Sequence, residues 1–165
     1  MPLTPETLLS RLDEAGYEIS TVRHPPLYTV ADSVKLRGNI DGRHTKNLFL
    51  KDKKDNYFLV TLGEDRVVDL KQLHKQIGAA SRLSFGKPEK LMEYLGILPG
   101  AVSAFAVVND AEGHVEAVFD QELMDHRLIN AHPLTNEATT TIATDALIEF
   151  MTQCGHAPRI LALST

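Results

Sequence analysis

The chain has 165 residues, of which 43% are hydrophobic and 24% charged, and its formal net charge is −5 at pH 7. This length and apolar fraction indicate one globular domain, residues 1–165, and exclude an intrinsically disordered chain. The acidic balance excludes a protein that coats nucleic acid through bulk positive charge, although a local basic patch can still bind the end of an RNA.

The single cysteine, Cys154, excludes an intramolecular disulfide and a cysteine-rich zinc cluster, which is typical of a protein in a reducing compartment. The N-terminal segment is amphipathic and acidic and has no apolar signal core. No apolar run approaches the length needed to cross a membrane. We therefore expect a cytoplasmic protein without membrane contact.

The first part of the chain predicts two helices separated by an extended piece. Thr4 is suited to cap a helix, Pro5 fits the first helical position, and Gly16 is a natural stop. After an extended piece at 17–22 and a proline-rich turn, a second helix is expected from residue 29 or 30 to residue 36, ended by a glycine.

Two β-hairpins are predicted in the centre of the chain. The first joins 47–50 to 57–62 across a polar turn, and the second joins 101–108 to 115–119 across another. Between them the pattern predicts a helix at 69–78, a short extended segment at 82–85 and a helix at 87–94.

The C-terminal part alternates between short extended segments and helices. The expected elements are a helical piece at 121–125, extended segments at 128–133 and 139–142, a helix at 145–154 capped by Thr144, and a strand at 159–163. Because strands come in hairpins without strict β-α-β alternation, we predict an α+β fold with a mixed, mainly antiparallel sheet and surrounding helices.

Several common kinds of catalytic site find no support in the residue pattern. None of the seven histidines lies in an HxH, HxxxH or HExxH arrangement that would bring two imidazoles to one metal. There is no GxSxG turn for a serine hydrolase, and the glycines form no Walker or dinucleotide loop. We therefore expect neither a metal nor another cofactor.

Three segments nevertheless place polar or small residues at unusual positions. His44-Thr45-Lys46-Asn47 stands at the entry of the first hairpin, where a lysine is held by the sheet and can face a cavity. Residues 96–104 form a loop of small residues that can bring backbone N–H groups close to a ligand. Residues 130–136 precede three consecutive threonines at 139–141. Each segment alone also has a purely structural explanation: a solvated lysine, a helix stop, a histidine before a proline, and the strand preference of threonine.

Five runs in order carry a resemblance to a known family: HPPLYTV at 24–30, GRHTKNLFLKD at 42–52, RLSFG at 82–86, LGILPGAVSAFAVVND at 95–110 and NAHPLTNEATTTI at 130–142. They resemble the freestanding aminoacyl-tRNA editing domains of the YbaK and prolyl-tRNA synthetase insertion superfamily. The similarity is greatest to the ProXp-ala branch, also called PrdX or ProX, and extends from about residue 24 to residue 163.

The resemblance implies an enzyme that hydrolyses the ester between a wrong amino acid and its tRNA. The essential lysine of the family corresponds to Lys46, with Asn47 beside it, and the histidine of the HPL segment corresponds to His132. The small-residue loop, written GxxxP in much of the superfamily, corresponds to Gly100 to Ala104. The alanine in place of the final proline bears on the shape of the pocket, and hence on amino-acid specificity more than on the chemistry.

The mechanism that the resemblance implies needs no metal and no protein nucleophile, because an aminoacyl ester is already activated. We expect the Lys46 ammonium to hydrogen-bond the ester carbonyl or the terminal ribose, and backbone N–H groups of 100–103 to stabilise the oxyanion. A free hydroxyl of the terminal adenosine is expected to help activate the water, and His132 to shape the aminoacyl pocket.

Two further sets of residues complete the expected site. The catalytic residues Lys46, Gly100 and His132 are expected to be surrounded by pocket residues, namely His44, Thr45, Asn47, Ala101, Val102, Ser103, Ala104, Asn130 and Asn136. Lys51, Lys53, Lys54 and Arg82 are candidates to hold acceptor-stem phosphates or terminal bases of the tRNA, and a solvated surface is the alternative for each.

The function expected from the sequence is a trans-acting deacylase for mischarged Ala-tRNA(Pro) that binds the acceptor end of the tRNA. It would work alone or in complex with prolyl-tRNA synthetase or an elongation factor. Another small amino acid, as in Cys-tRNA(Pro), is the rival substrate. A non-catalytic module that binds tRNA or a synthetase, and a small-ligand binding protein, are the rivals from other classes. The sequence leaves the oligomeric state open.

Overall fold

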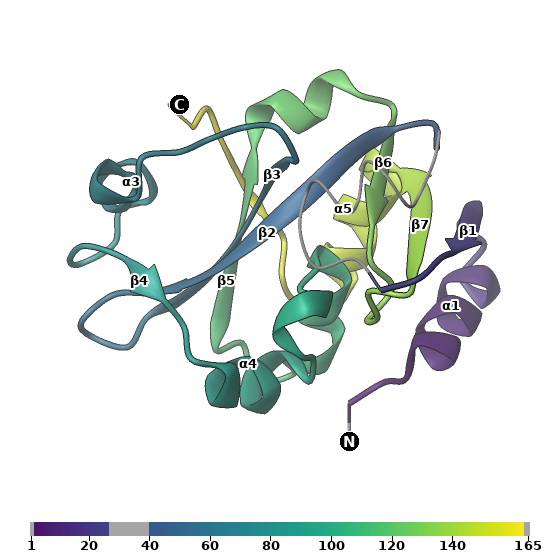
Figure 1. Ribbon diagram of the computed structural model, residues 1–165, viewed down its shortest axis with the longest axis horizontal. Helices are drawn as coiled ribbons and strands as arrows, with labels where there is room; N and C mark the ends of the chain where they lie inside the picture. Colours follow the sequence, from purple (N-terminus) through teal and green to yellow (C-terminus); the bar gives the residue numbers. More distant parts are fainter. Residues whose placement is uncertain (1, 27–39, 164–165) are drawn as a thin grey trace.

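The computed structural model of the protein describes residues 2–26 and 40–163 (Figure 1). The helix expected at 29–36 lies outside these residues. Eight strands form one sheet in the order β1-β7-β6-β2-β3-β5-β8, and β4 pairs with β2 outside this path. Among the described residues, no helix combines the length and the apolar character required to cross a bilayer.

The described elements follow one another in this order: α1 (Pro5–Glu14), β1 (Ile19–Arg23), β2 (Arg43–Lys51), β3 (Tyr57–Gly63), α3 (Leu70–Ile77), β4 (Ser84–Phe85), α4 (Pro88–Leu95), the 3-10 helices η1 (Pro99–Ala101) and η2 (Ala104–Asn109), β5 (Val115–Asp120), the 3-10 helix η3 (Gln121–Asp125), β6 (Leu128–Ala131), β7 (Ala138–Ala143), α5 (Thr144–Gln153) and β8 (Arg159–Leu161).

The sheet is mixed, which confirms the predicted α+β class. The pairs β1–β7, β2–β3, β2–β4 and β6–β7 are antiparallel. The pairs β2–β6, β3–β5 and β5–β8 are parallel. The parallel pairs join strands that are distant in sequence. The long β2–β3 hairpin lies in the middle of the sheet, with β6, β7 and β1 on the side of β2 and β5 and β8 on the side of β3.

Apolar side chains cover the sheet on both faces, because successive strand residues point to opposite sides. Tyr57 and Leu59 of β3 face a large core with α1, α4, α5 and η2. Phe58, Val60 and Leu62 face a smaller core with α3 and the segment after β8. Every residue of β3 is therefore buried. Among the described residues, the sheet separates α3 from α1, α4 and α5.

Helix caps explain why the predicted helix starts are confirmed. The Thr4 hydroxyl accepts a hydrogen bond from the Thr7 N–H at 3.1 Å, and the Asp69 carboxylate accepts one from Lys71 N–H at 3.0 Å. Gly78 ends α3 in the left-handed conformation, with φ of 74°. Thr144, predicted as a cap, is instead the first residue of α5, and its hydroxyl donates to the His126 carbonyl at 2.6 Å.

The second predicted hairpin is wrong. Residues 101–108 form no strand but contribute to η1 and η2, and β5 pairs in parallel with β3. Four consecutive residues of η2, 104–107, are buried. Because all sides of this helix are apolar, its sequence has no alternation of apolar and polar residues that would distinguish a helix from a strand. Ser103 starts η2 because its hydroxyl accepts the Phe105 N–H at 3.2 Å.

Strand β2 also differs from its prediction, because it begins at Arg43 and not at Asn47. The four polar residues that precede Asn47 were expected outside the strand. They join it because Arg43 and His44 pair with β6, a partner from the far end of the chain. The final strand β8 is shorter than expected and ends at Leu161.

Candidate active site

One edge of β2 is divided between two short partners. Arg43 and His44 pair with β6, whereas Leu50 and Lys51 pair with β4. The other edge pairs with β3 from Thr45 to Lys51. In the described part of the chain, the stretch from Thr45 to Phe49 thus has a strand partner on one side only, and the predicted catalytic lysine lies in it.

Lys46 points to the same face of the sheet as Leu48 and Leu50, because strand side chains alternate. Its side chain is partly buried, and its strand neighbour is Leu62 of β3. Among the described residues it has no hydrogen-bond or ion-pair partner. The Arg43 guanidinium and, more weakly, the Lys46 ammonium lower the pKa of Asp65. The positive charge of Lys46 is therefore close enough to the Asp65 carboxylate to interact with it.

Asn47 points to the opposite face and connects three elements. Its Oδ1 accepts the Thr61 hydroxyl at 2.6 Å, and its Nδ2 donates to the Val102 carbonyl at 3.3 Å. The amide therefore ties β2 both to β3 and to the loop before η2. One bond fixes the amide against β3 and the other reaches the loop. We infer from this that Asn47 positions the loop relative to its chain neighbour Lys46.

A polar cluster on the Lys46 face fixes the start of β2. Asn130 donates through Nδ2 to the Asp41 carbonyl at 3.0 Å and contacts His44 Nδ1 at 3.3 Å. Its Oδ1 accepts the Thr141 hydroxyl at 2.5 Å, and its carbonyl accepts the Thr45 hydroxyl at 2.7 Å. Because the amide must donate to the Asp41 carbonyl, it also donates to His44 Nδ1, which assigns the ring proton of neutral His44 to Nε2.

His132 is held in the other tautomer. Its Nδ1 lies 3.1 Å from the Ala138 carbonyl, which can only accept, so Nδ1 carries the proton and the lone pair of the neutral ring is on Nε2. His24 packs edge-on against this ring with 6.5 Å between centroids, and its Nε2 lies 2.8 Å from the Thr139 hydroxyl. The two histidine-proline segments of the sequence thus meet in space.

The loop of small residues is partly committed to its own turns. The Ala101 N–H donates to the Leu98 carbonyl at 2.9 Å, which leaves Gly100, Val102 and Ser103 as the positions for an oxyanion contact. Ala104, at the place of the family's proline, is completely buried in the large core.

A pocket of about 270 Å³ lies between this loop and the turn after β6. Of the predicted site residues it contains Gly100, Ala101 and Asn136, together with Met92, Leu98, Leu134 and others. Lys46 and His132 do not line it. The predicted residues thus form two neighbouring groups, joined through the Asn47–Val102 hydrogen bond.

Arg43 anchors β2 next to the site, a role that the sequence pattern did not reveal. Its guanidinium binds Glu122 at 2.9 Å and Asp65 at 2.6 Å, and Glu122 also binds His126 at 2.7 Å. Burial alone would raise the pKa of Glu122, but the hydrogen bonds from Arg43 and His126 outweigh it and lower the pKa. A side chain at Gly63 would overlap the guanidinium, which explains the glycine there.

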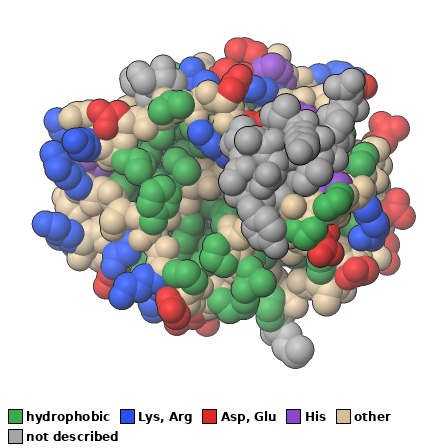
Figure 2. All heavy atoms as spheres, in the orientation of Figure 1, with side chains coloured by type: hydrophobic (Ala, Val, Ile, Leu, Met, Phe, Trp, Pro, Cys, Tyr) green, Lys and Arg blue, Asp and Glu red, His purple; other side chains and the backbone are tan. Residues whose placement is uncertain are grey.

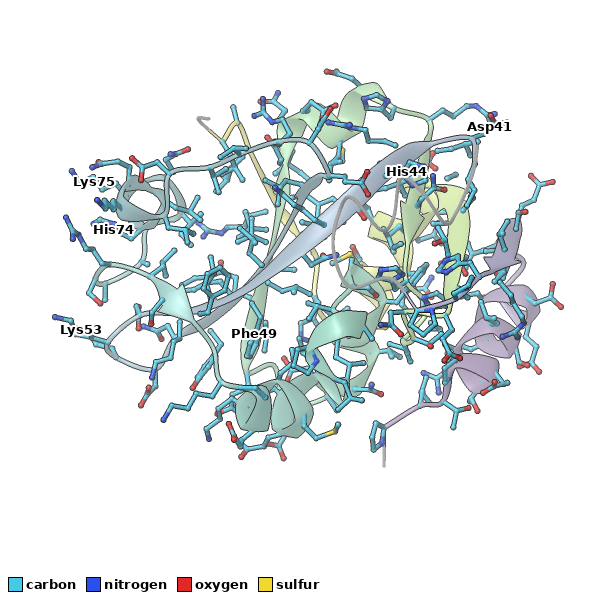
Figure 3. The ribbon with its side chains drawn as sticks, in the orientation of Figure 1. Asp41, His44, Phe49, Lys53, His74 and Lys75 are labelled. Carbon is cyan, nitrogen blue, oxygen red and sulfur yellow. The ribbon has the colours of Figure 1, made fainter. Side chains whose placement is uncertain are left out.

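The predicted tRNA-binding cations lie at the other end of β2. Lys51 is bound to Asp55 at 3.0 Å, which raises its pKa, whereas Lys53, Lys54 and Arg82 are exposed. The β2–β3 turn that carries Lys53 is fastened to the segment before β4, because Lys53 N–H donates to the Ser81 hydroxyl at 2.8 Å. Figure 3 shows Lys53 at the same end of the molecule as Lys75 of α3.

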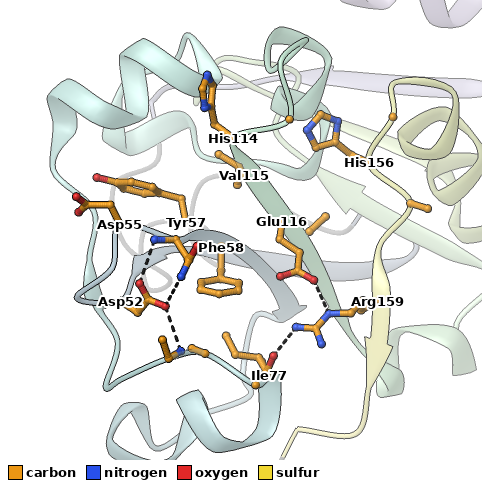
Figure 4. Close-up of a pocket in the computed structure, with 18 residues that line it drawn as sticks. Asp52, Asp55, Tyr57, Phe58, Ile77, His114, Val115, Glu116, His156 and Arg159 are labelled. Atoms are coloured by element: carbon orange, nitrogen blue, oxygen red, sulfur yellow. Dashed lines mark hydrogen bonds and ion pairs between the residues drawn. The ribbon is translucent and has the colours of Figure 1, made fainter.

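A larger cavity of about 710 Å³ lies away from the predicted residues, between the β2–β3 turn, the end of α3 and the ends of β5 and β8 (Figure 4). Its charged groups are paired with one another, with nearby side chains or with the backbone. Arg159 binds Glu116 at 2.7 Å and donates to the Ile77 carbonyl, and the Asp52 carboxylate accepts bonds from backbone N–H groups. None of the predicted catalytic residues lines it, so it is not the candidate active site.

Within the described ranges, no group of three or more His, Cys, Asp or Glu side chains could hold a metal ion. The residues that the prediction missed are the supports of the site, Thr61, His24 and Arg43. The HP pair at 24–25 was the one sequence signal that could have pointed to His24, and the sequence pattern offered none for Thr61 or Arg43.

Comparisons with known proteins identify the family of the chain. Residues 24–150 match the model of the family described as the aminoacyl-tRNA editing domain. The "Prolyl-tRNA editing protein ProX" of Acetoanaerobium sticklandii is 34% identical over 160 residues, which cover 96% of each chain. The "Prolyl-tRNA synthetase associated domain-containing protein 1" of Danio rerio is 37% identical over 159 residues, or 95% of this chain and 84% of the relative.

The fold also occurs among solved structures. A protein suggested to be a trans-editing enzyme for prolyl-tRNA synthetase superposes with a TM-score of 0.71 over 99% of both chains. Its sequence identity of 19% means that this likeness supports the fold alone.

Proposed function

The chain belongs to the aminoacyl-tRNA editing domain family, in its ProXp-ala-type branch, and from this premise we propose that it is a trans-acting deacylase of mischarged Ala-tRNA(Pro). The observation that carries the proposal is the position of Lys46. It lies in the part of β2 whose outer edge has no strand partner among the described residues, and it adjoins a residue that is hydrogen-bonded to the small-residue loop.

In the proposed reaction the protein orients the ester and stabilises charge. The Lys46 ammonium hydrogen-bonds the ester carbonyl or the terminal ribose, and backbone N–H groups of Gly100, Val102 and Ser103 complete the contact to the oxyanion. A hydroxyl of the terminal ribose assists the attacking water, which adds to the carbonyl carbon. Collapse of the tetrahedral intermediate breaks the bond to the ribose oxygen, which takes a proton and leaves with the tRNA.

The proposed roles of the neighbouring polar residues follow from their fixed hydrogen bonds. His132, whose Nδ1 proton is held by the Ala138 carbonyl, shapes the aminoacyl side of the site. Asn130 and Thr45 hold the start of β2 against β6. They therefore act by keeping Lys46 in place.

The aminoacyl pocket selects the amino acid in this proposal. The pocket of about 270 Å³ beside Gly100 and Asn136 is larger than either side chain, so its shape next to the ester, and not its volume, would have to exclude proline and protect the correct product. The buried Ala104 in place of a proline changes the loop behind this pocket. Cysteine, another small amino acid, remains the rival substrate.

The test is deacylation of Ala-tRNA(Pro) by the wild-type chain and by Lys46→Ala, in EDTA. We expect hydrolysis by the wild type that EDTA does not change. The substitution is expected to lower the rate about 100-fold or more, the usual effect of removing one donor to an oxyanion. Lys90→Ala, which removes a partly exposed lysine bound to Glu93, is the matched control and should keep the wild-type rate.

Parallel reactions separate the alternatives. Pro-tRNA(Pro) should remain intact, and Cys-tRNA(Pro) tests the rival specificity. Tight binding of every charged tRNA without turnover would support a non-catalytic module. Equal activity of the wild type and Lys46→Ala would contradict the proposed role of the lysine.

A further inference from the structure

An exposed aromatic ring stands on the same face of the sheet as Lys46. Phe85 of β4 is 60% exposed, although the other phenylalanines of the described strands are buried. In the β2–β4 ladder Phe85 lies opposite Leu50, and residues opposite one another in a ladder share a face. Leu50 in turn shares its face with Lys46, so the ring and the ammonium lie on the same face of the sheet.

The ring is held by a rigid support. Gly86 N–H donates to the Phe49 carbonyl at 2.9 Å, and a side chain at Gly86 would overlap the Phe49 ring. The segment before β4 is fixed as well, since Ala80 N–H donates to the Asp52 carboxylate at 3.1 Å. Because both flanks of β4 are anchored to the β2–β3 hairpin, the exposure of Phe85 is a fixed feature of the fold.

Positive charge surrounds this ring although the whole chain carries a net charge of −5. The exposed cations at this end come from the β2–β3 turn, from α3 and from both flanks of β4; they are Lys53, Lys54, Lys71, Lys75, Arg82 and Lys87. Asp55 is occupied by Lys51, and Asp69 caps α3, while Glu89 is an exposed acid in the first turn of α4. Figure 2 shows blue side chains along this end of the molecule, around a hollow lined by apolar groups.

We propose that Phe85 is a stacking platform for an unpaired base of the tRNA 3′ end, and that Arg82 and Lys87 hold the adjoining phosphates. An exposed aromatic ring flanked by cations is the arrangement that binds single-stranded nucleic acid, because every base has a π-face and every linkage a phosphate. The proposal rests on the tRNA substrate proposed above and adds where its unpaired end lies.

The geometry sets which nucleotide would reach the ring. Leu50 lies four positions after Lys46 in β2, a distance of roughly 13 Å along a strand. An ester held at Lys46 belongs to the last nucleotide. Its own base cannot be the one on Phe85 if the strand follows β2, so the platform serves a base that precedes it. Phe85 therefore affects binding of the tRNA end and does not touch the reacting ester.

The first test measures stacking directly, without turnover. A short single-stranded RNA with the 3′-terminal sequence of the tRNA carries 2-aminopurine at one internal position, since this fluorescent base is quenched when it stacks. We expect quenching by the wild type and by Phe85→Trp, about tenfold weaker binding by Phe85→Ala and Phe85→Leu, and no change for Ile160→Ala. Ile160 is an exposed apolar residue of β8 at the far edge of the sheet.

The same variants identify the partner by contrast. If Phe85→Leu binds and quenches like the wild type, the ring serves as a plain apolar surface, such as one for a protein, and stacking is refuted. If Phe85→Ala binds like the wild type, no platform exists. Arg82→Gln and Lys87→Gln should each reduce the slope of log affinity against log salt by about 0.7, as expected for one lost phosphate contact to a single strand.

The second test separates this inference from the proposed function. Phe85→Ala should lower kcat/KM for aminoacyl-tRNA about tenfold, mainly through KM, and leave hydrolysis of the aminoacyl-adenosine ester unchanged, because that substrate lacks the preceding base. A loss on both substrates would overturn the proposal. If the wild type hydrolyses no ester, the deacylase proposal fails, while the fluorescence assay still decides on the platform.

Discussion

Lys46 and Asn47 are neighbours in the chain that face opposite sides of the sheet, and the site depends on both. Lys46 carries a charge at the edge of β2 that has no strand partner among the described residues, whereas Asn47 donates to the Val102 carbonyl and fixes the loop on the other face. The Thr61 hydroxyl, which is buried, completes this brace by donating to Asn47 Oδ1. The proposed role of Lys46 therefore relies on a supporting amide whose own hydrogen bonds are internal.

Replacing Asn47 by alanine should weaken both stability and activity. The change leaves the buried Thr61 hydroxyl and the Val102 carbonyl without their partner, which costs about 1–3 kcal/mol in the free energy of unfolding. Deacylation should fall further than the folded fraction explains, because the loop is no longer tied to β2. Urea denaturation and single-turnover kinetics measure the two effects.

Thr61→Val is the matched control for this prediction. It removes the hydroxyl but keeps the bond between Asn47 and Val102, so it should lower stability and leave most of the deacylation rate intact. If both variants lost the same share of activity, the tie to the loop would not be the reason for the effect.

At the scale of elements, β4 has only two residues, but it covers the end of the β2 edge at Leu50 and Lys51. Its position depends on Gly86, whose missing side chain lets the chain pass over the Phe49 ring. Gly86→Ala should shift β4 from β2 and destabilise the protein by about 1–3 kcal/mol, as overpacking in a core does. Urea denaturation measures the loss, and hydrogen exchange at the Gly86 amide should report the weakened pairing.

A second substitution checks the cause. In Gly86→Ala combined with Phe49→Leu, the smaller side chain removes the overlap, so the double variant should be more stable than the sum of the two single effects predicts. Simple additivity would show that the alanine acts through the backbone and not through the ring.

Local signals explain which elements the sequence could predict. The caps at Thr4 and Asp69 and the apolar run of β3 lie within the segments that they define, and these predictions are confirmed. The start of β2 and the 3-10 helix η2 depend on distant partners, β6 for the first and a core closed on all sides for the second. No local pattern contains this information, and both predictions were wrong there.

The candidate site shows the same division. The segments around Lys46, Gly100 and His132 stood out through their composition and their resemblance to a family. The contacts between them did not, because Asn47 and Val102 are 55 residues apart and Asn130 and His44 are 86 apart. The exposed Phe85 could not be found either, since exposure of an aromatic residue is decided only when the strands are in place.

For the whole molecule, three carboxylates connect segments that are distant in the sequence, and the pKa of each of them is lowered. Burial alone would raise the pKa of Asp52, but hydrogen bonds from Asn56, Ala80 and Lys54 outweigh it. Glu122 is lowered through Arg43 and His126 against the effect of its burial, and Asp65 through Arg43. A pKa that is lower in the folded than in the unfolded state makes folding more favourable when the group is charged.

The protein should therefore lose stability in acid. The contribution of these carboxylates is complete above their unfolded pKa, at about 4 to 4.5, and is lost as the pH falls through the lower folded values.

Asp52→Asn should lower the free energy of unfolding at pH 7 by about 2 kcal/mol, because an amide cannot accept all the bonds that Asp52 accepts from N–H groups. The difference between the variant and the wild type should shrink as the pH falls through the lowered pKa of Asp52, since the carboxyl group of the wild type then becomes protonated. Asp55→Asn, which removes only the exposed partner of Lys51, is the matched control and should change stability by less than about 1 kcal/mol. Urea denaturation at a series of pH values measures all three proteins, and parallel curves for Asp52→Asn and the wild type down to pH 2 would show that the charge of Asp52 does not stabilise the fold.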